Sequence, residues 1–187
     1  MADLFQRETT VALLHEFTQT DSLRRHANAV EAAMKAAADR TGNDVEYWSA
    51  VGLLHDFDYE KYPEAPDHPL KGAEILRERG YPEEFVRTIL SHASYTGVPR
   101  ENECAKWLFA VDELCGFCMA CAMVQPDKKI AQVKVKSVKK KLKKKDFAAK
   151  VNRQEIREGA ADLGLELDEV IAHVLEALVP VGVQLGL

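Results

Sequence analysis

This sequence of 187 residues lacks several features that mark other classes of protein. It has no apolar run near the roughly 18 residues that a membrane-spanning helix needs. It shows no convincing period-two alternation of a β-strand, no internal repeat and no interdomain linker. Residues 1–4 have no basic start and no long apolar run, so we expect no signal peptide, a cytoplasmic protein and no membrane partner. These absences predict an all-α fold, an irregular helical bundle forming a single domain over residues 1–187.

Cysteine is scarce, with four residues that all lie between positions 104 and 121. Cys115 and Cys118 have the spacing of a redox or zinc-binding pair, but the chain has no second pair of this kind. The segment around them is an apolar helical pattern, which favours small core side chains over metal ligands. We therefore expect reduced thiols in the core, as is usual in a cytoplasm.

Acidic residues are missing from positions 128–145, where ten lysines stand. The net charge of the chain is −5, so the remainder has 15 basic against 30 acidic residues and carries −15. The molecule should therefore be acidic with one basic edge, which is either a solvated face, a contact to a substrate phosphate or a nucleic-acid surface. Nucleic acid is the least expected partner, because no aromatic residue is interleaved for base stacking. Lys136, Lys139 and Lys140 are the candidate phosphate-binding residues.

Apolar residues recur mainly at spacings of three and four, which is typical of helices with one buried face. The pattern predicts helices over about 7–19, 22–40, 45–54, 68–79, 82–92, 101–124 and 168–178, with shorter ones near 137–145 and before Gly164. Asp44, Ser137 and Asp168 are the expected N-cap residues of three of them. His15 and His173 are expected to be structural.

His55 and Asp56 place an imidazole and a carboxylate side by side at the end of an apolar run. Adjacent residues of a regular helix point about 100° apart, so both can reach one ion only where the helix ends or bends. His26 lies on the inward face of the preceding helix, and Asp112 lies beside the apolar stripe of a later one. A buried carboxylate without a partner costs several kcal/mol, so Asp112 should have a cationic partner or a metal ion. On its own, His26 would be expected to be a core histidine, and a mixture of imidazole and carboxylate donors would suit Mn, Fe, Co, Ni or Zn.

The order of these residues, a His, then His-Asp, then a distant Asp, resembles the HD superfamily of metal-dependent phosphohydrolases. The resemblance runs from Arg25 to Glu113. It rests on the local contexts Arg25-His26, Leu54-His55-Asp56, His68-Pro69-Leu70-Lys71-Gly72-Ala73-Glu74-Ile75-Leu76, Leu90-Ser91-His92 and Val111-Asp112-Glu113. The common form of the motif continues as Ile-Gly after His-Asp, whereas this chain has Phe57-Asp58, a departure that leaves the ligands intact.

The resemblance implies that the four donors hold one divalent ion, for which Mg would also fit. It implies that His68 and His92 hold a second ion, with Asp56 bridging the two. The metal-site core then spans about residues 20–125, and the lysine-rich segment and the C-terminal helices follow over residues 126–187.

The implied activity is hydrolysis of a small phosphorylated substrate, a nucleotide or a related phosphomonoester or phosphodiester, by metal-activated water. Asp58 and Glu60 follow the His-Asp pair and are candidate general bases, and His68 and His92 are candidate catalytic residues beside them. Two alternatives stay open. One is a di-iron oxygenase on the same scaffold, which the second pair of histidines permits. The other is a nucleotide or nucleic-acid binding module that uses the lysine-rich segment.

Overall fold

The computed structural model describes residues 4–187, and over this range the chain is helical with no strand. The all-α prediction is therefore confirmed. The elements are α1 (Arg7–Phe17), α2 (Asp21–Thr41), α3 (Val45–Leu54), α4 (Asp67–Glu78), α5 (Glu83–Leu90), the 3₁₀ turn η1 (Ser94–Thr96), α6 (Glu103–Met123), the 3₁₀ turn η2 (Ile130–Gln132), α7 (Val135–Leu142), α8 (Arg153–Asp162), α9 (Leu167–Leu178) and α10 (Gly182–Leu185).

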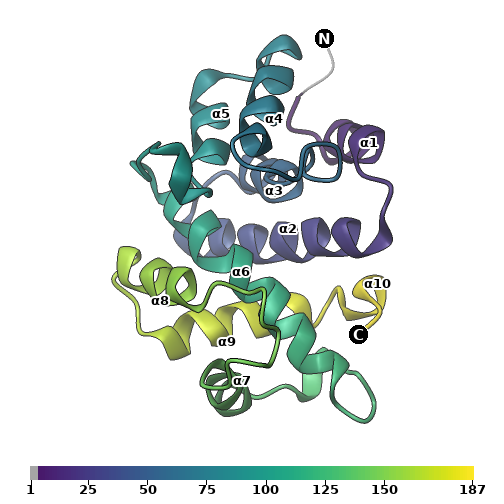
Figure 1. Ribbon diagram of the computed structural model, residues 1–187, viewed down its shortest axis with the longest axis vertical. Helices are drawn as coiled ribbons and strands as arrows, with labels where there is room; N and C mark the ends of the chain where they lie inside the picture. The colour runs from purple at the N-terminus through teal and green to yellow at the C-terminus, as the bar shows by residue number, and fades with distance from the viewer. Residues whose placement is uncertain (1–3) are drawn as a thin grey trace.

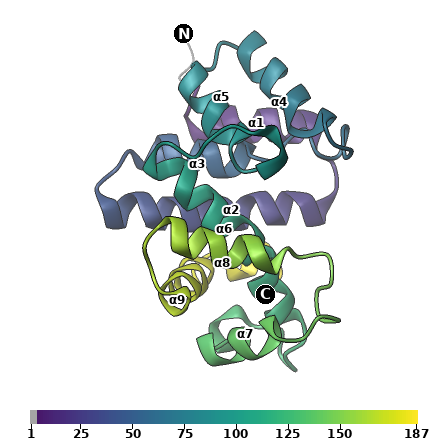
Figure 2. The same cartoon turned by 60° about the vertical axis from the view of Figure 1, so that its left-hand side comes forward.

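The two longest helices, α2 and α6, cross near the middle of the molecule (Figure 1). Helices α1, α3, α4 and α5 lie on one side of α2, and α7, α8, α9 and α10 lie on the other. Figure 2 shows the same division from a second direction. The arrangement leaves the middle of α2 and the N-terminal half of α6 facing the end of α3.

Glycine allows the closest helix contacts. A Cβ atom on Gly52 of α3 would lie 2.8 Å from the Cα of Glu31 on α2, and one on Gly159 of α8 would lie 2.5 Å from the Cα of Ala110 on α6. Any larger side chain would push these helices apart, because protein interiors are close-packed. The α2–α3 contact holds the end of α3 close against α2, which bears His26.

The core confirms the expectation for cysteine, since all four thiols are free and buried in α6. His173 is buried, and its Nε2 donates to the carbonyl oxygen of Ala33 at 3.0 Å, which is a structural role. His15 lies exposed on α1. Among the helices of residues 4–187, none combines the length and apolar character needed to cross a membrane.

Two predicted caps are wrong. Helix α7 begins at Val135, and the backbone N–H groups of Ser137 and Val138 donate to the carbonyl oxygen of Lys134, so Ser137 lies inside the helix. Helix α9 begins at Leu167, and Glu166 forms a capping box with Glu169 that satisfies two backbone N–H groups. The third prediction is confirmed, since the Asp44 carboxylate accepts from the first turn of α3.

Candidate metal centre

The structure brings together the side chains that were predicted to hold metal, from five different helices or helix ends. They fall into two groups whose ligand atoms lie within 4.8 Å of one another, His26 with His55 and Asp112, and Asp56 with His68 and His92. The predicted end of the helix is also confirmed, because α3 stops at Leu54 and turns follow. That ending lets His55 and Asp56 point into one cluster.

The first group is compact. The Nε2 atom of His26 lies 3.0 Å from Asp112 Oδ1, and the Nε2 atom of His55 lies 3.3 Å from the same oxygen. The two Nε2 atoms lie 3.2 Å apart. Two imidazole nitrogens and a carboxylate oxygen that converge in this way suit a divalent transition-metal ion.

Asp56 lies between the groups. Its Oδ1 is 3.2 Å from the Nε2 atoms of both His68 and His92, and its Oδ2 is 3.5 Å from His55 Nε2. This carboxylate is thus the one that can contact an ion in either group, as a bridging ligand would.

Hydrogen bonds behind the imidazoles fix which nitrogen faces the cluster. The Nδ1 atom of His55 donates to the carbonyl oxygen of Gly52 at 2.8 Å, and that of His92 donates to Ile89 at 2.6 Å. A carbonyl oxygen can only accept, so each Nδ1 carries a hydrogen and Nε2 is the nitrogen that faces the cluster.

Asp58 supports His68 in the same way and does not line the hollow over the cluster. Its side chain is 1% exposed. Its Oδ1 accepts from His68 Nδ1 at 2.9 Å, and its Oδ2 accepts from the backbone N–H of Gly72 at 2.8 Å. This placement suits a role in orienting His68, and the general-base role of Asp58 stays a prediction.

Glu60 is also placed elsewhere than predicted. Its carboxylate accepts from the backbone N–H groups of Gln19 and Thr20 and from the Thr20 hydroxyl, at 2.6, 3.0 and 2.9 Å. These bonds cap the start of α2, and they lower the pKa of Glu60. Because Glu60 does not line the hollow over the cluster, its prediction as a base finds no support in the geometry.

The three lysines predicted to bind a substrate phosphate lie on α7, away from the cluster. Lys139 pairs with Asp168 of α9 at 2.6 Å. Lys136, Lys139 and Lys140 line a separate hollow with Val135 and Lys143. No lysine or arginine of the described chain lines the hollow over the cluster, so these residues are not brought to the candidate centre.

That hollow has a volume of about 400 Å³ and contains functional candidates that the sequence reasoning missed. Tyr59 and Tyr95 lie at its edge with exposed rings, and the Tyr95 hydroxyl donates to the carbonyl oxygen of His68 at 2.5 Å. Glu113 and Glu155 form part of its wall. Glu113 follows Asp112 directly and could have been found from that spacing, whereas only the packing of α8 on α6 brings in Glu155.

Charge within the cluster shifts several pKa values. Burial opposes protonation of His55 and His68, but the neighbouring carboxylates outweigh it and raise their pKa to about 10 and about 9. Burial alone would raise the pKa of Asp56 and Asp112, but the imidazoles around them hold both below the usual range. Burial and then the charge of Asp112 raise the pKa of Glu113 to about 7.

These shifts predict that metal binding is coupled to pH. His55 and His68 hold protons at pH 7, and a cation can bind only after those protons leave. The affinity for a divalent ion should therefore rise with pH until about pH 9 to 10, by up to about tenfold per pH unit for each proton released. Titration calorimetry with Mn²⁺ in two buffers of different ionisation enthalpy would count the protons. An affinity that stays constant between about pH 7 and 9 would contradict this expectation.

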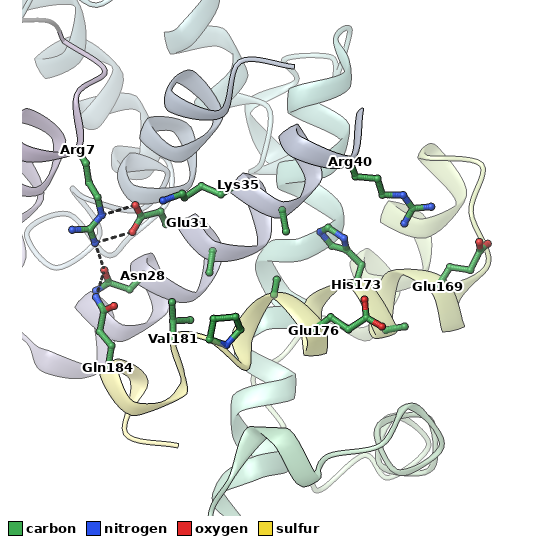
Figure 3. A pocket seen from close by; sticks show the side chains of 15 residues that line it. Arg7, Asn28, Glu31, Lys35, Arg40, Glu169, His173, Glu176, Val181 and Gln184 are labelled. Carbon is green, nitrogen blue, oxygen red and sulfur yellow. Dashed lines mark hydrogen bonds and ion pairs between the residues drawn. The ribbon is translucent and has the colours of Figure 1, made fainter. Parts of the chain in front are cut away.

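A larger hollow of about 820 Å³ lies between α2 and α9 (Figure 3). Its wall holds an ion pair in which Arg7 donates to both carboxylate oxygens of Glu31, at 2.7 and 3.0 Å. The imidazole of His173 also lines this hollow, and its Nε2 already forms a hydrogen bond to the carbonyl oxygen of Ala33. Neither of the two groups of metal-ligating side chains found in residues 4–187 lies here, so size alone does not make this hollow the reactive one.

Comparison with known families agrees with the His and Asp cluster as the candidate metal centre. Residues 23–114 match the family model described as HD domain, a range that contains every predicted metal ligand. A search of curated proteins and a search of solved structures each found no match.

Proposed function

Residues 23–114 make this chain a member of the HD-domain superfamily, and from that premise we propose that it is a divalent-metal-dependent phosphohydrolase. Its substrate would be a small phosphate ester, a nucleotide or a related phosphomonoester or phosphodiester, cleaved by metal-activated water. The observation that carries the proposal is the convergence of the two ligand groups on Asp56.

His26, His55, Asp56 and Asp112 would hold one ion, and His68 and His92 would hold a second with Asp56 between them. Such an ion lowers the pKa of bound water and neutralises charge on a phosphoryl oxygen. The chain's own part is positional: Gly52, Ile89 and Asp58 hold three imidazoles with Nε2 facing the cluster. A site preorganised in this way needs little rearrangement when substrate binds.

In this proposal Glu113 is the general acid that protonates the leaving oxygen of the ester. Its pKa of about 7 keeps the carboxyl group partly protonated near neutral pH. It lines the same hollow as the ligands, so it can deliver the proton on its carboxyl oxygen to the departing oxygen of the ester. The sequence-based candidates Asp58 and Glu60 are both occupied by other hydrogen bonds.

The lining of the hollow supports a small substrate of limited charge. No arginine or lysine of residues 4–187 lines it, so charge neutralisation on the phosphate falls to the metal ions. A volume of about 400 Å³ lies in the lower part of the range for small-molecule sites, about 300–1,000 Å³. The rings of Tyr59 and Tyr95 offer a face for a base or another flat group.

One specific observation favours a second candidate function, that of a di-iron oxygenase. Asp56 contacts imidazoles of both groups, and a carboxylate placed in this way could bridge two iron ions. The two activities differ in their products, since only hydrolysis releases phosphate without consuming dioxygen.

The test is elemental analysis of the purified protein followed by assay of the metal-free form reconstituted separately with Mn²⁺, Co²⁺, Zn²⁺ and Fe²⁺. Each form is given p-nitrophenyl phosphate, bis-p-nitrophenyl phosphate and the nucleoside 5′-monophosphates, with and without oxygen. We expect oxygen-independent phosphate ester cleavage that a chelator removes and added metal restores. Turnover confined to the iron form with oxygen would favour the oxygenase, and no activity with any combination would contradict the hydrolase.

A further inference from the structure

The metal centre does not use the basic end of the molecule, which we define as residues 123–145. Ten lysines and one acidic residue lie in it. Within residues 4–187 only Lys139 of these ten forms an ion pair, and Lys141 alone lies over an aromatic ring, that of Phe147. Most of this positive charge is therefore free to meet an external partner.

The basic end is part of the folded core and is not a loose tail. Val138 and Leu142 of α7 are buried at 0% and 4% exposure, and Ile130 and Val133 anchor the preceding turn. Since these apolar side chains face inward, the lysines of α7 must face outward. Figures 1 and 2 both place α7 and the end of α6 at the same extremity of the molecule.

Two apolar side chains stand out at this extremity. Met123 and Val124, at the end of α6, are each 57% exposed. The next residue, Gln125, lines one hollow together with Lys140, Lys141 and Lys144, so the apolar pair lies beside the lysines. The end of α6 and α7 therefore combine lysines with an exposed apolar pair.

We propose that the basic end binds an anionic lipid surface, with the lysines against the headgroups and Met123 and Val124 entering the boundary below them. The charge distribution gives the orientation, because the rest of the chain has 15 basic against 29 acidic residues, carries −14 and is repelled by the same surface. A polynucleotide is less well matched, since exposed apolar side chains gain nothing from a phosphodiester backbone and no aromatic residue lies in residues 123–145 for stacking. This proposal departs from the sequence-based expectation of no membrane partner, which rested on the lack of a spanning segment, because peripheral contact needs no spanning helix.

This contact would leave the metal centre open. Asp112 precedes Met123 by 11 residues on α6, or about 16 Å along the helix axis. The inference therefore does not rest on the proposed hydrolysis, and either can fail alone.

Binding is tested by co-sedimentation of the full chain with vesicles of phosphatidylcholine alone and of phosphatidylcholine mixed with phosphatidylglycerol. We expect binding only to the mixed vesicles at ~0.1 M salt and its loss at ~0.5 M salt, where screening is stronger. The triple variant K136Q/K140Q/K143Q should bind roughly 100-fold more weakly, at about fivefold per lysine. The matched control K35Q/R40Q/K61Q removes equal charge elsewhere and should bind as the parent does.

A second variant separates lipid from other partners. M123S/V124S keeps every charge and should weaken vesicle binding roughly tenfold, while leaving any binding to duplex DNA unchanged. Circular dichroism confirms that each variant is folded. Equal binding to both kinds of vesicle, an equal loss in the control, or DNA binding tighter than vesicle binding would each overturn the proposal. So would self-association through the basic end that the lysine triple variant abolishes.

Discussion

Asp56→Ala is expected to remove bound metal and hydrolytic activity together. Among residues 4–187, Asp56 is the one carboxylate that contacts imidazoles of both ligand groups, so its loss weakens both candidate ion positions. A catalytic metal contributes several kcal/mol to the transition state, so activity should fall by roughly 10³-fold or more. Metal content by plasma emission spectrometry and initial rates with the best ester of the panel would measure the two effects.

Glu60→Gln is the matched control, because it also alters an acid in the segment after the His-Asp pair. Its carboxylate caps α2 and does not line the hollow, so metal content and rate should stay near those of the parent. A small decrease in melting temperature is expected from the weaker cap. Full metal occupancy in Asp56→Ala, or loss of metal in Glu60→Gln, would remove the basis for the ligand assignment.

The sequence could predict which residues gather in the cluster because part of their signal is local. His55 and Asp56 are neighbours, and the apolar run before them ends where α3 ends, so both turn toward one point. Helical periodicity places His26 and Asp112 on or beside the inward face of their helices, and the resemblance to the HD superfamily, not periodicity, predicts them as ligands. The same reasoning correctly gave a helical fold and buried cysteines.

The partners of those ligands depend on how distant segments pack, and sequence reasoning failed there. In the sequence Asp58 has no visible partner. In the fold, α4 packs so that His68 and the N–H of Gly72 both donate to its carboxylate. Glu155 reaches the hollow only because α8 packs on α6, 43 positions beyond Asp112 in the sequence. The lysines of α7 could be expected to bind substrate phosphate because a charge pattern in the sequence does not give distances in space. In the fold, the C-terminal half of α6 separates α7 from Asp112.

Asp58→Asn should lower the metal affinity while leaving the maximal rate nearly intact. The buried carboxylate accepts from His68 Nδ1 with one oxygen and from Gly72 N–H with the other. An amide has one acceptor oxygen, so in the variant its NH₂ group must face one of these two donors. Loss of such a supporting bond typically costs about 10–100-fold in metal affinity or activity. If Asp58 acts through His68, excess metal should restore kcat.

Two further variants sharpen this test. In Gly72→Ala the added Cβ would lie 2.7 Å from Asp58 Cγ, so the carboxylate must move although Asp58 itself is unchanged. It should therefore reproduce the weaker metal binding of Asp58→Asn. Glu74→Gln on the same helix loses only the exposed contact with Lys71 and should behave as the parent does. A kcat that stays low at saturating metal in Asp58→Asn, with Gly72→Ala unaffected, would instead return Asp58 to the role of general base, because that outcome requires the carboxylate and not the position of His68.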